Sequence, residues 1–422
     1  MPHAELYIVL AAVFGVIMAW GVGANDVANA MGTSVGSKAL TVMQAIVIAA
    51  IFEALGALLA GGQVTDTIRG KIIDVAVFAH HPMLLIFGMM ASLLAAGTWL
   101  IAASSFGWPV STTHSIVGAV IGFGFVSFGV DAVHWHEVIN IALSWVVTPM
   151  IALVFAFLLF RSVQSLIFES TTPLRNAKKY IPAYIFLVAL VLALVTLFNG
   201  LKHVGLHLNA AQCVLIAVLF SIFVTCVGQW SIARIAIDAQ DEHRLDFDKL
   251  EKIFAVLMLF TACAMAFAHG SNDVANAIGP LAAIVGVVSS GGDVTSASVI
   301  PFWVMVLGAS GIVAGLAMYG HKVIATIGSE ITQLTPSRGF AAQLATATTV
   351  VVASGLGLPI STTQTLVGAV LGVGFARGIG ALNLSVVRNI FMSWVVTLPA
   401  GAVLSIAYYQ AIRLTFFHFG IV

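Results

Sequence analysis

The chain has 422 residues, enough for two or three soluble domains, but its composition excludes a water-facing surface. Hydrophobic residues make up 60% and charged residues only 8%, with a mean hydropathy of +1.07, whereas soluble proteins carry about 25% charged residues. The 17 acidic and 17 basic residues balance, so no charged field for nucleic acid is expected. The three cysteines lie in apolar runs and are expected to be buried thiols, without disulfides or a metal site: Cys213, Cys226 and Cys263.

Apolar stretches long enough to cross about 30 Å of hydrocarbon recur along nearly the whole chain. Eight full crossings are predicted near residues 6–33, 40–61, 138–160, 181–199, 208–229, 252–280, 297–320 and 387–412. Residues 1–7 carry no Lys or Arg, so the first crossing is expected to belong to the mature structure rather than to a secretory signal. The sequence therefore predicts an all-α polytopic membrane protein with 10–12 apolar helical segments.

Two further apolar segments, 83–128 and 340–376, are each interrupted near the middle by a proline. The interruptions are Gly107-Trp108-Pro109 and Gly357-Leu358-Pro359. Proline breaks a continuous helix, so each segment is predicted to form a helical hairpin whose tip stops inside the membrane. Broken backbone at that depth is tolerated only where it is buried in protein or lines a cavity.

Three sequence blocks occur twice in the same order, which indicates a duplication. The blocks at 23–30, 109–118 and 144–148 return at 270–277, 359–368 and 393–397. The offsets of 247, 250 and 249 residues are almost constant. We predict a first repeat over 1–160, a connector with two membrane helices over 161–250, and a second repeat over 251–422.

The number of crossings predicts that the two repeats have opposite orientations. Five crossings precede the second repeat, and a hairpin returns to its starting side. With both termini outside, 13 basic residues face inward: Lys38, Arg161, Arg175, Lys178, Lys179, Arg234, Arg244, Lys249, Lys252, Lys322, Arg338, Arg377 and Arg388. Four face outward: Arg69, Lys71, Lys202 and Arg413. Inverted repeats with broken helices are typical of transporters, and we expect a multi-pass protein of the plasma or inner membrane.

Three acidic residues lie well within predicted crossings: Asp26, Glu53 and Asp273. An ionised side chain there costs several kcal/mol, so each needs a partner or a function. The alternative is a structural carboxyl group that is kept protonated or hydrogen-bonded between helices. This structural interpretation is stronger for Glu53 than for the two aspartates, because a 250-residue offset places Trp303 at the equivalent position.

The first duplicated block contains the pattern Asn-Asp-x-x-Asn, and we call its two copies, 23–30 and 270–277, the signature blocks. The Asp and the second Asn of each pattern lie on one helix face. The members of the pattern are Asn25, Asp26 and Asn29 in the first repeat and Asn272, Asp273 and Asn276 in the second. Carboxylate and amide oxygens suit a hard cation such as Na⁺. The flanking glycines and alanines are also typical of ordinary helix packing, which leaves the Asn-Asp pairs unexplained.

Hydroxyl residues follow each hairpin proline: Ser111, Thr112 and Thr113, and Ser361, Thr362 and Thr363. Such residues are helix N-caps in the first place. A helix start with free N–H groups and hydroxyls is also an anion site. Two such starts, meeting near the midplane beside acidic cation sites, indicate symport of an anion with a cation.

Three polar residues near these motifs allow more than one interpretation. His114 follows the first tip, where the second tip has Gln364, and His269 precedes the second signature block. A buried histidine is more often a hydrogen-bonded structural residue than a proton carrier. A role in coupling or proton transfer is therefore the second interpretation for both His114 and His269.

At these motifs the sequence resembles the inorganic phosphate transporter (PiT) family, over nearly the whole chain outside 161–250. The resemblance implies import of orthophosphate with Na⁺ or H⁺ and no further cofactor. It implies cation sites at Asp26, Asn29, Asp273 and Asn276, a phosphate site at the six hydroxyl residues of the two tips, and a functional role for Glu53. Gln343 stands where sodium-coupled members tend to have a second glutamate, and Gln364 where a histidine is common, so the coupling ion stays open. A homo-oligomer is compatible with this architecture.

Four alternatives to phosphate symport remain. The same architecture could carry another oxyanion such as sulfate, or a neutral metal–phosphate complex with protons. A membrane enzyme would use His114 with Asp26 or Asp273 as acid and base, although no nucleophile motif is present. A channel would show uptake that neither saturates nor follows the cation gradient.

Overall fold

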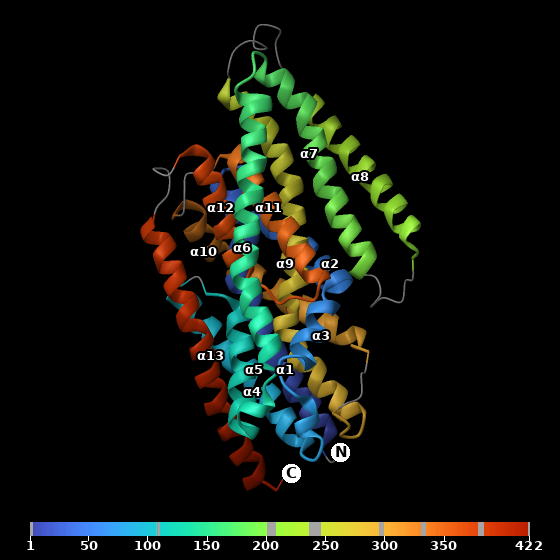
Figure 1. Ribbon diagram of the computed structural model, residues 1–422, viewed down its shortest axis with the longest axis vertical. Helices are drawn as coiled ribbons and strands as arrows, with labels where there is room; N and C mark the ends of the chain where they lie inside the picture. The colour runs from blue at the N-terminus through green and yellow to red at the C-terminus, as the bar shows by residue number, and fades with distance from the viewer. Residues whose placement is uncertain are drawn as a thin grey trace.

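Thirteen α-helices make up almost all of the described chain (Figure 1). The computed structural model describes residues 3–106, 108, 110–200, 208–235, 246–294, 299–330, 335–378 and 384–420. The helices are α1 Ala4–Gly36, α2 Val42–Ala60, α3 Gly62–Gly70, α4 Pro82–Ser105, α5 Thr112–Phe128, α6 Trp135–Val163, α7 Pro173–Val195, α8 Ala210–Ala233, α9 Phe247–Ser289, α10 Phe302–Glu330, α11 Pro336–Gly355, α12 Thr362–Arg377 and α13 Leu384–His418.

Nine helices of the described chain are long and apolar enough to cross a membrane. They include one helix for each of the eight predicted crossings, and the ninth is α4, the first arm of the predicted hairpin over 83–128. The helix α9 is longer than predicted, with 43 residues, because Pro280 lies inside it and does not end it. The short helix α3 was not expected from the sequence.

The helix starts follow from local capping residues. Thr41 and Gln44 form a capping box at the start of α2, as do Asn209 and Gln212 at the start of α8. Asp246 caps α9 through the backbone N–H of Lys249. Each cap satisfies backbone N–H groups that the first helical turn leaves without partners.

The two hairpins occupy opposite halves of the molecule. The first hairpin, α4 and α5, lies in the half that also holds both chain termini, which we call the terminal end (Figure 1). The second hairpin, α11 and α12, lies in the other half, toward the connection between α6 and α7, which we call the connector end. The predicted break at 107–109 falls partly outside the described residues, since Gly107 and Pro109 are not among them. In the second hairpin, Gly357 turns the chain with φ +73, a conformation that favours glycine.

The contacts between the two halves are reciprocal. Gly118 of α5 faces the backbone carbonyl of Leu398 in α13, and Gly368 of α12 faces that of Pro149 in α6. Positions 118 and 368 are equivalent in the duplicated sequence, as are 149 and 398. In each case the missing side chain lets two helices approach backbone to backbone. An inverted relation between the repeats stays a prediction, and these exchanged contacts support it.

The helices α7 and α8 lie together at one side of the molecule (Figure 1). Only 17% of the most apolar stretch of α8 is buried. Cys226 on α8 is therefore exposed, and the prediction that all three cysteines are buried is wrong for it. Cys213 is buried, and Cys263 is partly buried.

Candidate functional site

Carboxyl groups from both signature blocks converge on one imidazole at the centre of the molecule. Asp26 of α1, Asp273 of α9 and His269 of α9 bring one polar atom each to within 4.8 Å of one another. The Nε2 atom of His269 lies 2.9 Å from Asp273 Oδ2, and its Nδ1 atom lies 3.2 Å from Oε1 of Glu53. Glu53, His269 and Asp273 have no exposed surface, and Asp26 is 1% exposed.

Close helix packing positions Glu53 on α2. Gly270 of α9 faces the backbone carbonyl of Glu53, and Gly23 of α1 faces that of Ile312 in α10. Since 23 and 270 are equivalent positions, Ile312 is the counterpart of Glu53 in the packing. A constant offset of 250 residues pointed to Trp303 instead, and it fails here because the repeats differ in length between their blocks. The buried carboxyl group of Glu53 thus has an apolar counterpart.

The second asparagine of each signature block contacts the hydroxyl residues of a hairpin tip. Asn29 Nδ2 donates to Thr363 Oγ1 at 2.7 Å and to Asp26 Oδ1 at 3.0 Å. Asn276 Nδ2 donates to the hydroxyl oxygens of Thr112 and Thr113, both at 3.2 Å. Each asparagine therefore contacts the tip that belongs to the other repeat.

The signature block of α9 also holds the second hairpin. Thr362 Oγ1 donates to Asp273 Oδ2 at 2.9 Å. Asn272 Nδ2 donates to Ser354 Oγ at 3.0 Å and to the carbonyl of Leu358 at 3.1 Å. The residues predicted to bind a cation and those predicted to bind phosphate are thus joined by direct hydrogen bonds.

The two hairpin tips meet at the same place. Thr113 Oγ1 of the first tip donates to the carbonyl of Ile360 in the second at 2.9 Å. Ser111 and Ser361 cap their helices, accepting from the N–H groups of His114 and Gln364 at 3.2 and 3.3 Å. The capping role considered from the sequence is therefore real for these two serines. All six tip hydroxyl residues are at most 5% exposed.

Several buried oxygens of the signature blocks accept no hydrogen bond: Asp26 Oδ2, Asp273 Oδ1, Asn272 Oδ1 and Asn276 Oδ1. Buried polar atoms normally have partners, so such a group points to a ligand. Three carboxyl groups facing one imidazole leave excess negative charge whenever they are ionised. Oxygen donors with excess negative charge fit a hard cation such as Na⁺. The expected convergence of amide and carboxylate oxygens is only partly present, because Asn29 turns its nitrogen toward Asp26.

The remaining candidate residues lie around this centre. Asn25 is 4% exposed, and its Nδ2 atom has no hydrogen-bond partner. His114 packs its ring against Trp145 with centroids 3.8 Å apart. Gln364, at the equivalent position of the second tip, is buried as well. Gln343 lies on α11, where it accepts a hydrogen bond from Thr261 Oγ1 at 2.9 Å and donates to Ser34 Oγ at 2.7 Å.

Sequence reasoning missed residues that hold the second tip. Trp145 Nε1 donates to the carbonyl of Pro359 at 3.0 Å, and Thr67 Oγ1 of α3 donates to that of Gly357 at 2.7 Å. The repeated Ser-Trp-Val-Val-Thr block could have suggested a role at the tip for Trp145, whereas nothing in the sequence singled out Thr67. For His269 the sequence favours a structural role over proton transfer, and its spacing of four residues from Asp273, which places both on one helix face, could have predicted their contact.

Comparisons with known proteins identify the family of the chain and a solved structure with a similar fold. The sequence profile of a family described as the phosphate transporter family matches residues 22–405. A putative phosphate permease of Haemophilus influenzae is 54% identical, covering 96% of this chain and 97% of the relative. A chloroplastic inorganic phosphate transporter of Arabidopsis thaliana is 44% identical over 94% of this chain and 70% of the relative. A solved structure described as the sodium-dependent phosphate transporter superposes with a TM-score of 0.90 at 40% identity, covering 97% of this chain and 99% of that one.

Proposed function

Because this chain belongs to the phosphate transporter family, we propose that it imports inorganic phosphate by cation symport, with Na⁺ as the favoured coupling ion. The nine membrane-crossing candidates among the described helices, together with the family, make it a multi-pass membrane protein. Phosphate binds between the two hairpin tips, at Ser111, Thr112, Thr113, Ser361, Thr362 and Thr363. Asn25, Asp26, Asn29, Glu53, Asn272, Asp273 and Asn276 form the cation sites.

The hydrogen bonds between the signature blocks and the tip threonines are the observation that carries this proposal. Asn29 binds Thr363, Asn276 binds Thr112 and Thr113, and Asp273 binds Thr362. A cation on the Asp273 carboxylate competes for the oxygen that accepts from Thr362, so this hydroxyl can then donate to phosphate. Thr112 and Thr363 accept from the asparagine amides and keep their own hydroxyl hydrogens for phosphate. The bound phosphate balances the added positive charge. Each ion thus improves the binding of the other, which is a reciprocal coupling.

Na⁺ is favoured over H⁺ for two reasons. The buried oxygens without hydrogen-bond donors are ligands for a hard cation rather than a path for protons. The similar solved structure is also described as sodium-dependent. Gln343 and Gln364 cannot take up a proton, so H⁺ coupling would depend on His114 or on the carboxyl groups at the centre.

We assign transport to alternating access between the two ends of the molecule. The tips close over one another at mid-length, and either end can open if one hairpin moves relative to α1 and α9. We place the connector end in the cytoplasm, because the basic residues that favour that side gather there, among them Arg161, Lys178 and Arg338. We place the protein in the plasma or inner membrane of the cell. A homo-oligomer is compatible with this proposal.

Phosphate uptake into proteoliposomes under separately imposed Na⁺ and pH gradients tests the coupling. We expect saturable uptake driven by an inward Na⁺ gradient and unchanged by a pH gradient alone. Uptake driven only by the pH gradient would assign the coupling to H⁺. Uptake that neither saturates nor follows a gradient would indicate a channel.

Sulfate and phosphoesters test the remaining alternatives in the same liposomes. Labelled phosphate uptake should persist in excess sulfate, whereas full competition would make the protein a general oxyanion carrier. Dependence of uptake on a divalent metal would favour a metal–phosphate complex as the substrate. The family is one of transporters, and turnover of a phosphoester by purified protein would be needed to revive an enzymatic role.

A further inference from the structure

A buried polar network joins α1, α9 and α11 between the central site and the connector end. Gln343 of α11 donates from Nε2 to Ser34 Oγ at 2.7 Å and to the carbonyl of Ala30 at 3.2 Å. Its Oε1 accepts from Thr261 Oγ1 of α9 at 2.9 Å. Gln343, Ser34 and Thr261 have no exposed surface. One side chain therefore fastens three helices together.

The network continues toward the connector end. Ser37 Oγ donates to Met258 Sδ at 3.2 Å, and the Met258 side chain fills the space beside Gly339, which lacks a side chain of its own. Ser337 at the start of α11 donates from its backbone N–H and its hydroxyl to the carboxylate of Glu251 at 2.8 and 2.7 Å. We call this set of contacts, from Ala30 and Gln343 to Glu251 and Ser337, the α1–α9–α11 seam.

The seam begins directly beside the proposed cation site. Ser34 lies eight residues after Asp26 on the same helix, about 12 Å along its axis. Thr33 follows Asn29 by one turn and lies on the same helix face. The contacts among α1, α9 and α11 therefore lie on the connector-end side of the proposed cation site.

The equivalent positions at the terminal end are apolar. The sequence offsets relate Gln343 to Leu93, Ser34 to Leu281, Thr261 to Phe14 and Ser337 to Phe87. Leu93, Leu281 and Phe87 are fully buried. At these equivalent positions the two ends of the duplicated core thus differ, with hydrogen-bonding side chains at the connector end and apolar side chains at the terminal end.

This difference has an energetic consequence. Hydrogen-bonding groups that separate in the presence of water exchange one partner for another, so the net cost of opening is small. Separated apolar surfaces instead lose the full benefit of burial. A polar seam can therefore open and become hydrated more readily than its apolar counterpart.

We propose that the α1–α9–α11 seam is the gate through which phosphate and its coupling cation leave toward the connector end, and that Gln343 is the latch of this gate. The inference rests on the proposed symport for the identity of the ions, but the gate itself is observable without transport. Gln343 closes the gate by holding α11 to α1 and α9 through its hydrogen bonds. This role does not require contact between Gln343 and an ion.

Thiol accessibility tests the latch. In a background with Cys213, Cys226 and Cys263 replaced by serine, Thr33→Cys places a reporter between the cation site and the seam, where Thr33 is 5% exposed. A membrane-impermeant thiol reagent is applied to the connector end. Gln343→Met keeps the side-chain length and removes the hydrogen bonds, and Gln343→Ala removes both. We expect each to raise the modification rate at least about fivefold, the population change expected for losing one net hydrogen bond.

Leu93→Ala, the equivalent truncation at the terminal end, is the matched control and should leave the rate unchanged. Unchanged rates in both Gln343 variants would overturn the proposal, as would an increase in Gln343→Ala alone, since that would reflect a cavity. An equal increase in Leu93→Ala would reflect general loosening and would also overturn it. Thermal unfolding of each variant in detergent confirms that the compared proteins are folded. If the latch variants open the seam but the parent protein moves no phosphate, the gate stands and the proposed symport fails.

Discussion

The centre of the molecule holds three buried carboxyl groups with few positive partners. Asp26, Glu53 and Asp273 are fully or almost fully buried, and only His269 among their described partners can bear positive charge. Burial of an uncompensated carboxylate costs several kcal/mol, so this arrangement is retained for a purpose rather than for stability. In the symport that we propose, a bound cation supplies the missing charge.

Removing one charge at the centre should abolish transport and leave the fold intact. Asp26→Asn and Asp273→Asn keep the side-chain shape but lose the negative charge that attracts the cation. We expect Na⁺-driven phosphate uptake in proteoliposomes to fall to the level of empty liposomes, with normal amounts of protein in the membrane. Asp131→Asn, at an exposed position, is the control and should transport normally. Near-normal uptake in both test variants would remove the cation site from these residues.

His269 should matter for stability as well as for transport. Its replacement by alanine leaves the carboxyl groups of Glu53 and Asp273 buried without their shared partner, which costs about 3–5 kcal/mol when a buried pair is broken. We expect a clear fall in the thermal unfolding temperature in detergent. His321→Ala, at an exposed position on α10, should leave that temperature unchanged. Equal unfolding temperatures in the two variants would mean that His269 does not bridge the carboxyl groups.

At the scale of elements, the hairpin tips depend on helices outside the hairpins. The second tip is held from three sides, by Trp145 of α6, Thr67 of α3 and Asn272 of α9. These bonds end on backbone carbonyls, so they fix the course of the chain rather than a particular side chain. The proposed phosphate site is therefore shaped in part by helices outside the hairpins.

Loss of one tip contact should weaken phosphate binding without unfolding the protein. Trp145→Phe removes the N–H group that donates to the Pro359 carbonyl and keeps most of the ring that packs on His114. A hydrogen bond contributes about 1 kcal/mol, so we expect the KM for phosphate to rise several-fold. Initial uptake rates over a range of phosphate concentrations measure this. Trp230→Phe, on the exposed side of α8, serves as control, and a rise of the same size there would argue against a specific tip contact.

Glycine spacing decides how closely α1 and α10 can pack. Gly315 of α10 faces the backbone carbonyl of Trp20 in α1, so an added methyl group has to push two helix backbones apart. Overpacking costs about 1–3 kcal/mol, occasionally more, and we expect Gly315→Ala to lower the unfolding temperature. Gly70→Ala, where nothing lies within 4 Å, should have little effect. An unchanged unfolding temperature for Gly315→Ala would show that the helices can separate freely.

The sequence predicted the elements better than the contacts between them. Hydropathy and proline positions located the crossings and both hairpins, because lipid imposes length and composition on each helix separately. The bridging geometry of His269, the tip contact of Thr67 and the counterpart of Glu53 could not be predicted. These depend on how helices distant in sequence are rotated against one another, and a change in repeat length moved the counterpart from Trp303 to Ile312. The assigned site residues stay predictions, although the structure brings most of them together.

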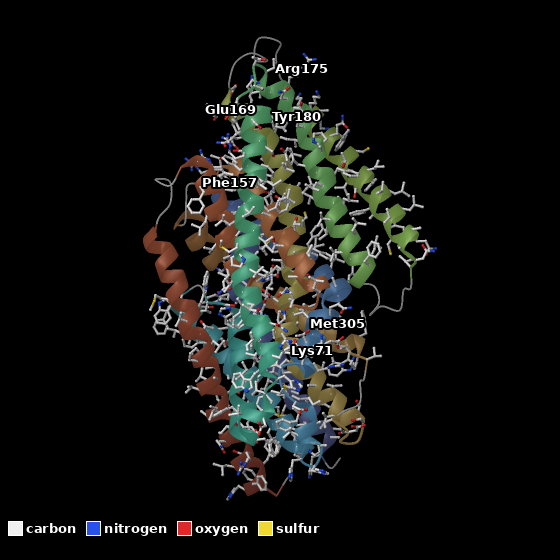
Figure 2. All side chains as sticks on the ribbon, viewed as in Figure 1. Lys71, Phe157, Glu169, Arg175, Tyr180 and Met305 are labelled. Atoms are coloured by element: carbon white, nitrogen blue, oxygen red, sulfur yellow. The ribbon has the colours of Figure 1, made fainter. Side chains whose placement is uncertain are left out.

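At the scale of the whole molecule, the two ends differ in the charged groups and chain termini that they hold. The connector end carries ion pairs and basic side chains, including Arg161 with Glu169 and Lys249 with Asp246, and Arg175 and Glu169 lie at its extreme (Figure 2). Both chain termini lie at the other end, and Lys71 lies on that side of the middle. Repeats that carry equivalent motifs at the centre thus end in different surroundings at the two ends of the molecule.

Labelling from the two sides of a membrane tests the orientation that this asymmetry implies. Thr171→Cys at the connector end and Phe419→Cys at the terminal end are exposed positions, each placed singly in the cysteine-free background. With the connector end in the cytoplasm, an impermeant thiol reagent added to intact cells should modify Phe419→Cys at once, and Thr171→Cys only after the membrane is opened. The reverse pattern would invert the topology and with it the direction assigned to the gate. An odd number of crossings separates the two positions, so they should lie on opposite sides of the bilayer. Modification of both residues from one side would contradict this topology.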